Sequence, residues 1–229
     1  MMRVAVIDRR RILRWLVFSV GVMLVAIGAG RIARAQTDSV EQVEIRDYKG
    51  EKLGSIDDFQ ENSISGVQYI DPKTYTLLVD GLVSTPQVFT YAELEEQTHT
   101  EKVVTLECVD GWSVKALWQG IPLSVLFDQV GPTGEVNTVV FYAEDGYSTS
   151  LPLKDILDRN LIIADHVNGL ILPPAQGFPF QLVAEDKWGY KWIRWITHIE
   201  LTDDPTFRGY WESRGYSNRG EVDGAMFGE

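Results

Sequence analysis

The stretch KVVTLECVDGWSV, residues 102–114, combines a strand pattern, a turn signal and an isolated cysteine. Residues 102–109 alternate broadly between apolar and polar side chains, which predicts a β-strand. The dipeptide Asp110-Gly111 follows directly and is typical of a turn. Cys108 ends the strand and is the only cysteine among 229 residues. One cysteine cannot form an internal disulfide, so this thiol needs another explanation if the protein is exported.

The segments around this strand predict an α+β domain, mainly of mixed β-sheet with short helices. We expect strands at 75–83 with an Asp-Gly turn, and at 138–143, 147–151, 161–165, 170–173, 179–185 and 192–201. Asn168-Gly169 predicts a hairpin turn. We expect short helices at 90–97, which opens with the capping box of Thr90 and Glu93, at 121–131, between Pro122 and Gly131, and at 152–159.

Residues 1–35 have the pattern of a targeting element. They contain seven arginines against one acid, Asp8, and residues 15–30 are uncharged and apolar. The order Arg9-Arg10-Arg11 is close to a twin-arginine export signal. Two interpretations stay open, a signal cleaved before Gln36 and an apolar helix retained as a membrane anchor over residues 12–32. Both place the rest of the chain outside the cytoplasm, in the periplasm or at the cell surface.

The charge is distributed unevenly. The net charge of −12 and the +6 of residues 1–35 leave −18 on residues 36–229. An acidic body repels phosphate backbones, so nucleic acid is not an expected partner. The polar segment 36–70 has no sustained period and predicts a linker followed by an N-terminal segment that lies on the domain. The domain itself is expected to span residues 71–229, including a C-terminal tail.

Apart from Cys108, the sequence contains few residues in the arrangement of a known catalytic motif. His99, His166 and His198 are scattered and are expected to be surface or core histidines, and the sequence has neither H-E-x-x-H nor G-x-S-x-G. Cys108 could serve as a single soft metal ligand if a cofactor supplies further sulfurs. The alternatives are a small buried apolar residue and a redox-sensing thiol with a low pKa.

A second group of residues lies in KWGYKWIRWITHIEL, residues 187–201. Lys191 and Arg194 stand among aromatic residues, and Gly189 allows close approach of a backbone. Cations framed by aromatic rings suit a phosphorylated, flat, heteroaromatic ligand. The alternative is a strand with Ile193 inward and the cations outward.

These segments, in this order, resemble the molybdopterin-binding domain of the sulfite oxidase superfamily. The resemblance runs from Tyr75 to Leu201 and rests on YTLLVDGLV, VVTLECVDGWSV, LWQGIPLSVLF, VVFYAEDGYSTSLPL and LPPAQGFPFQLVAEDKWGYKWIRWITHIEL, followed by GYWESRGYS. It implies that Cys108 ligates molybdenum through its thiolate, while the pterin supplies two more sulfurs. Whether tungsten could replace molybdenum stays open.

The resemblance also implies cofactor-binding residues. Lys191 and Arg194, with Gly189 and Tyr190 in the same segment, match positions that hold the pterin phosphate by side chain or backbone. Asn62 matches a family asparagine that contacts the pterin.

Two glutamines depart from the family pattern. Gln176 stands where many members have His or Asn, and Gln181 stands where they have Arg. Gln176 is still expected to contact the cofactor. Glutamine keeps hydrogen bonding but loses charge, so the phosphate would depend more on Lys191 and Arg194. This departure leaves open a cofactor-free binding domain that kept the fold.

The residues after Cys108 distinguish branches of the superfamily. Asp110 and Trp112 stand where sulfite-oxidising members have an arginine-containing run that helps bind the anion. The stretch looks more like the periplasmic methionine-sulfoxide reductase catalytic subunit. We expect Asp110, Trp112 and Tyr147 to line the substrate pocket; an ordinary aromatic core is the alternative for the two rings.

The expected function is that of an exported oxidoreductase that depends on a molybdenum cofactor. It would transfer an oxygen atom or two electrons between a substrate and the metal. The resemblance favours a reductase, and the alternative is a sulfite oxidase-type enzyme. The substrate would be a small-molecule or protein-borne oxo compound. The sequence has no C-x-x-C-H haem motif, so a separate redox partner is expected, such as a membrane cytochrome or a quinone-linked protein.

Overall fold

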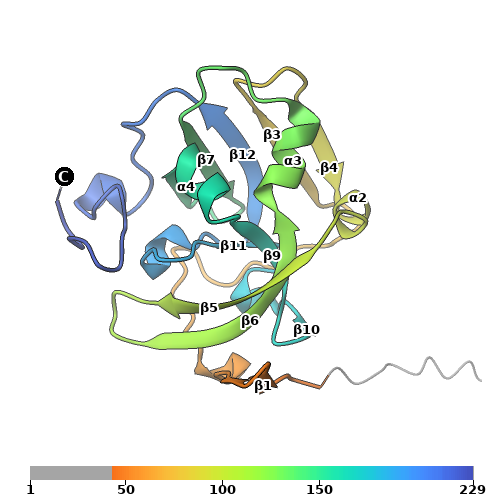
Figure 1. The fold of residues 1–229 in the computed structure, drawn as a ribbon, viewed down its shortest axis with the longest axis vertical. Coiled ribbons are helices and arrows are strands. Elements are labelled where there is room, and N and C mark those ends of the chain that lie inside the picture. Colours follow the sequence, from red (N-terminus) through yellow and green to blue (C-terminus); the bar gives the residue numbers. More distant parts are fainter. Residues whose placement is uncertain (1–42, 229) are drawn as a thin grey trace, which may run out of the picture. The chain divides into compact units, whose positions relative to one another are not determined.

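The computed structural model describes residues 43–228, which contain two five-stranded β-sheets and a two-stranded hairpin (Figure 1). Three short α-helices connect the strands. The expected α+β class with mainly mixed sheet is therefore confirmed. The expected targeting element and apolar helix fall on residues 1–42, outside the described residues. Within residues 43–228, no helix is long and apolar enough to cross a membrane.

The first sheet contains the cysteine strand and is antiparallel throughout. Its strands are β5 (Thr100–Glu107), β6 (Ser113–Pro122), β9 (Ile162–Val167), β10 (Leu170–Ile171) and β11 (Gln181–Val183). The long strands β5 and β6 form a hairpin along the lower part of Figure 1. Their connecting loop, residues 108–112, contains Cys108.

The second sheet is mixed. Its order is β4 (Gln87–Thr90), β3 (Thr76–Gly81), β12 (Ile196–Thr202), β7 (Thr138–Ala143) and β8 (Ser148–Pro152). The central strands β3 and β12 are parallel, and the other pairs are antiparallel. Strand β12 follows the segment 187–195 directly, so the sheet fixes one end of that segment.

The helices follow the capping signals of the sequence. Helix α2 (Tyr91–Glu95) has the expected capping box of Thr90 and Glu93. Helix α3 (Leu123–Val130) begins after Pro122 and ends at Gly131 in the left-handed conformation, and α4 (Leu153–Asp158) follows Pro152. Before the first sheet, β1 (Asp47–Tyr48), β2 (Glu51–Lys52) and the 3₁₀ turn η1 (Ile56–Asp58) form the N-terminal segment.

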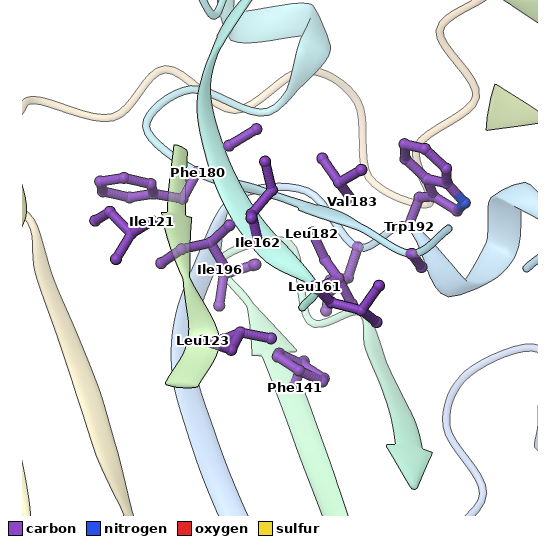
Figure 2. Packing of buried hydrophobic residues seen from close by; sticks show 14 of the residues in the cluster. Ile121, Leu123, Phe141, Leu161, Ile162, Phe180, Leu182, Val183, Trp192 and Ile196 are labelled. Atoms are coloured by element: carbon purple, nitrogen blue, oxygen red, sulfur yellow. The ribbon is translucent and has the colours of Figure 1, made fainter. Parts of the chain in front are cut away.

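Apolar side chains from both sheets meet in one core (Figure 2). Ile121, Ile162 and Leu182 come from the first sheet, and Phe141 and Ile196 come from the second; all five are fully buried. Complete burial of such a side chain stabilises the fold by about 1.5–3 kcal/mol. This packing fixes the strand ends from which the loops of the site extend.

The structure corrects three expectations about strands. The strand expected at 192–201 begins only at Ile196, because Trp195 has a φ of 55° that interrupts extended backbone. Asp80-Gly81 is not a turn but the end of β3, where Gly81 lies against the backbone of Leu201. Strand β6, ten residues long, was not expected because its buried residues obscure any period of two.

Candidate active site

The loop between β5 and β6 holds the cysteine in a tight turn. The Cys108 amide donates to the Trp112 carbonyl at 2.9 Å, and the Gly111 amide donates to the Cys108 carbonyl at 3.0 Å. Gly111 has a φ of 89°, a conformation that glycine adopts without strain. The turn expected from Asp110-Gly111 is therefore confirmed, and it positions the thiol at the end of the hairpin.

A cavity of about 300 Å³ opens around this thiol. Its walls come from segments far apart in the chain, namely 59–64, 106–112, 145–147, 176–195 and 211–216. Nine of the ten predicted site residues line it: Asn62, Cys108, Asp110, Trp112, Tyr147, Gln176, Gly189, Tyr190 and Arg194. The fold therefore brings together residues that the sequence separates by more than a hundred positions.

The thiol itself is buried, with 5% of Cys108 exposed. Asn62 Nδ2 lies 3.6 Å from Cys108 Sγ, and Asp110 Oδ2 lies 3.7 Å from it. Burial raises the pKa of the Cys108 thiol, and the negative charge of Asp110 adds to this effect. A redox-sensing thiol requires a lowered pKa, so this environment does not favour that alternative.

The segment 187–191 lies directly beside the cysteine. A parallel β-bridge joins Glu107 to Trp188, so the next residue, Gly189, faces the loop. A Cβ atom at Gly189 would lie 3.3 Å from the Glu107 carbonyl oxygen and 3.4 Å from Cys108 Cα. Glycine therefore permits this close approach, as the sequence predicted, although the segment forms the 3₁₀ turn η3 (Gly189–Lys191).

Arg194 is the only lysine or arginine among the described residues that line the cavity. Its Nη1 donates to the Ala175 carbonyl at 2.7 Å, and its guanidinium lies 4.6 Å from the centroid of the Trp195 ring. Glu61 Oε1 lies 3.4 Å from Nη2. Burial lowers the pKa of Arg194 from its ordinary value, and Glu61 opposes this effect. The guanidinium is thus fixed in position and remains available to an anion.

Lys191 differs from the expectation. Its side chain is fully buried, and its Nζ lies 2.6 Å from Glu212 Oε1 and 3.1 Å from the Ser150 carbonyl. It does not line the cavity. Its ammonium group pairs instead with a buried carboxylate from the C-terminal tail, so the geometry does not support a contact between this group and a ligand phosphate. A role for its backbone stays a prediction.

Aromatic side chains form much of the wall. The Tyr147 hydroxyl donates to the Tyr190 carbonyl at 2.6 Å, and burial raises the pKa of Tyr147 far above its ordinary value. Trp112 packs edge-on against Phe59 with ring centroids 6.4 Å apart. Both predicted rings therefore border the cavity as well as the core. Lining of a substrate pocket and packing in the aromatic core are thus compatible for Trp112 and Tyr147.

Three buried polar atoms in the wall have no hydrogen-bond partner within residues 43–228. They are Ser63 Oγ, Trp112 Nε1 and Gln181 Oε1. Buried polar groups are almost always paired. Two donors and an acceptor that surround one cavity fit a ligand rich in polar atoms, as a pterin is. Together with the soft Cys108 sulfur and the Arg194 charge, these residues fit a metal–pterin cofactor.

Several residues that line the cavity were not predicted from the sequence. Ser63 and Asp145 lie in irregular segments, and Trp211 and Tyr216 belong to the tail after β12. Gln181 was noted only as a departure from the family pattern. The segment GYWESRGYS could have identified the two tail rings, since it belongs to the resemblance; nothing in its residues alone indicates that it turns back to the cavity.

The three histidines lie elsewhere. His99 and His166 each bond the buried carboxylate of Asp165, at 2.8 and 2.9 Å, and His198 bonds Asp80 at 2.6 Å. Within the described part of the chain, no three or more His, Cys, Asp and Glu side chains form a metal-binding cluster. The expectation of ordinary surface or core histidines is confirmed.

Comparisons with known proteins agree with this geometry. Residues 64–211 match the family described as "Oxidoreductase molybdopterin binding domain". The chain is 32% identical over 154 residues to the uncharacterized oxidoreductase YuiH of Bacillus subtilis, covering 67% of this chain and 77% of that protein. It is also 32% identical over 151 residues to a putative protein-methionine-sulfoxide reductase subunit, YedZ1, of Azospira oryzae, covering 66% of this chain and 57% of that protein.

Among solved structures, the sulfane dehydrogenase SoxCD from Paracoccus pantotrophus is similar in fold. The TM-score is 0.59 at 24% identity, and the match covers 61% of this chain and 41% of that chain. This likeness concerns the fold alone.

Proposed function

Because the chain belongs to the family of oxidoreductase molybdopterin-binding domains, we propose that Cys108 is the thiolate ligand of a molybdenum–pterin centre in a reductase-like enzyme. The observation that carries this proposal is the position of the only cysteine of the chain in a cavity where three buried polar atoms lack hydrogen-bond partners within the described residues. One thiolate suffices, because the pterin dithiolene would supply further soft ligands. Elemental analysis of the purified protein distinguishes molybdenum from tungsten.

Several residues would hold the cofactor. Arg194 would bind its phosphate by charge-assisted hydrogen bonds, since it is the cation at the cavity wall. Gln176 and Gln181 would form hydrogen bonds to the pterin without adding charge, and Asn62 would contribute a further donor. When bound, the group supplies oxygen-atom transfer and two-electron redox chemistry, and the protein supplies position and electrostatics.

The charges of the cavity bear on the substrate. Asp110 and Asp145 both line it, so a dianion such as sulfite would meet two carboxylates. Trp112 and Tyr147 present rings that suit an uncharged molecule with an apolar substituent. We therefore favour reduction of a sulfoxide-like oxo compound over oxidation of sulfite. The similarity to a relative named as a protein-methionine-sulfoxide reductase subunit supports this choice.

The electrons would come from a separate redox partner. The sequence contains no C-x-x-C-H haem motif, and the relative from Azospira oryzae is named as a subunit. A membrane cytochrome or quinone-linked protein is the proposed class of partner. The arginine-rich, apolar residues 1–35 support export to the periplasm or attachment at the cell surface.

The test is metal and pterin analysis of protein produced in a host that makes the cofactor. We expect about one molybdenum and one pterin per chain, and loss of the metal but not of the fold in Cys108→Ser. A dye-coupled assay with methionine sulfoxide and with sulfite then gives the substrate preference. A parent protein without metal and pterin would refute the proposal and favour the cofactor-free binding domain.

A further inference from the structure

The C-terminal tail completes the cavity. Trp211 and Tyr216 line it, although they lie after the last strand of the sheets. The tail contains only the 3₁₀ turn η4 (Glu212–Arg214) and isolated bridges, so its own secondary structure does not hold the two rings in place. Their position therefore depends on contacts with the rest of the domain.

The residue that anchors the rings is Glu212. Its carboxylate and the Lys191 ammonium form an ion pair in which both side chains are fully buried, at 2.6 Å. The Thr149 hydroxyl donates to the same carboxylate oxygen, and the Tyr210 amide donates to the Ser148 carbonyl at 2.9 Å. Trp211 lies between Tyr210 and Glu212 in the chain, so these bonds fix it on both sides.

A second ion pair holds the end of the tail. Lys187 is also fully buried, and its Nζ lies 2.7 Å from both Asp155 and Glu221. Glu221 lies five residues beyond Tyr216, and neither Lys187 nor Glu221 lines the cavity. Lys187 thus pairs with two partly exposed carboxylates and Lys191 with one fully buried carboxylate, and only the Glu212 pair is adjacent in sequence to a wall residue.

The ring of Tyr216 packs edge-to-face with the rings of Trp211 and Tyr190. The Tyr216 ring lies 5.1 Å from the Tyr190 ring and 5.4 Å from the Trp211 ring, between centroids. Tyr190 and Lys191 are consecutive, so the segment that carries one part of the cavity wall also carries the lysine that pairs with the tail.

We propose that the Lys191–Glu212 ion pair is a positioning device for Trp211 and Tyr216, and that these two rings set the size of the substituent that a substrate can bring into the cavity. The proposal rests on the proposed function, because it assigns the substrate selectivity of the same site. Glu212 acts through the rings and touches no substrate. The tail is thus part of the specificity pocket.

The test compares kcat/KM for a bulky aryl sulfoxide, methyl p-tolyl sulfoxide, with that for dimethyl sulfoxide in the holoenzyme. Trp211→Ala and Tyr216→Ala should raise this ratio about tenfold, since one shape-determining contact discriminates by that order. Glu212→Gln should raise it in the same direction, mainly through KM. The matched variant Glu221→Gln, the same substitution at the other pair, should leave it unchanged.

Two results would overturn the proposal. One is an unchanged ratio in Trp211→Ala and Tyr216→Ala, which remain informative even if Glu212→Gln does not fold. The other is an equal rise in Glu212→Gln and Glu221→Gln, which would indicate general loosening of the tail.

Limited proteolysis, which does not depend on catalytic turnover, tests this proposal independently of the proposed function. Trypsin cleavage after the exposed Arg214, followed by mass spectrometry, should be faster in Glu212→Gln than in Glu221→Gln. Equal rates would overturn the positioning role whether or not the protein contains a cofactor. If the parent protein contains neither metal nor pterin, but Glu212→Gln is still cleaved faster than Glu221→Gln, only the proposed function is refuted.

Discussion

Replacing Arg194 by methionine should release the cofactor while leaving the cysteine loop intact. The side chain is 13% exposed, and its guanidinium is the only cation among the described lining residues. A hydrogen bond to a charged partner contributes about 1.5–3 kcal/mol. Loss of one such bond to the phosphate therefore corresponds to about 10- to 150-fold weaker binding of the pterin.

The same substitution has a separate effect on stability. Arg194 Nη1 donates to the Ala175 carbonyl at 2.7 Å, and methionine cannot replace this bond. Leaving a buried acceptor unpaired costs about 1–3 kcal/mol, and the partly buried Ala175 carbonyl should lie at the lower end of this range. Urea denaturation should therefore show a lower free energy of unfolding in Arg194→Met, and this decrease must be measured separately from cofactor loss.

The assay is the pterin content per chain, by fluorescence after acid oxidation, over repeated gel filtration. Arg194→Lys keeps the charge but loses the planar fork, so its retention should lie between those of the parent and Arg194→Met. Arg46→Met, at an arginine with 52% of its side chain exposed and outside the cavity, is the control. Equal pterin retention in the parent and Arg194→Met would refute the assignment of the phosphate to this residue.

Three further predictions concern other parts of the molecule. Cys108→Ser should keep pterin but lose metal and all turnover, as measured by elemental analysis and dye-coupled assay; full activity would contradict the ligand role. The hydrogen bond to Asp165 raises the pKa of His166 above 6.5. Its stabilising contribution is therefore complete below about pH 6.5 and is lost as the pH rises through the raised pKa. Urea denaturation across this range should show a shallower decrease in His166→Asn, and identical pH profiles would contradict the argument. Gly120→Ala would place a methyl group on the Ile163 carbonyl and should destabilise the fold by about 1–3 kcal/mol in the same assay, without altering the metal-to-pterin ratio; an unchanged midpoint would contradict it.

The sequence predicted the elements with strong local signals. The capping box at Thr90, the residues Pro122 and Gly131 around α3, and the Asn168-Gly169 turn all depend on neighbouring residues, and all are confirmed. Strand β6 escaped prediction because it pairs on both sides, with β5 and β9, and so has no regular exposed face. The local alternation of apolar and polar residues thus failed to predict a strand whose burial is set by tertiary packing.

The candidate site residues were predicted mainly from the family resemblance. It implied roles for Cys108 and Gly189, and the structure places both at one cavity. The roles themselves stay predictions. The ion pair of Lys191 was not predicted, because its partner, Glu212, lies 21 residues away in a segment without any period. No local sequence signal distinguishes a lysine that binds a ligand anion from one that forms an ion pair with a carboxylate of the protein.

The hairpin loop of residues 108–112 has a consequence for how such enzymes diversify. Cys108, Asp110 and Trp112 all lie in this loop, and two backbone hydrogen bonds, from Cys108 to Trp112 and from Gly111 to Cys108, close it. Behind it, β5 pairs along its full length with residues 113–120 of β6. Substitutions at these three positions therefore change the lining of the cavity while the backbone pairing of β5 with β6 is retained.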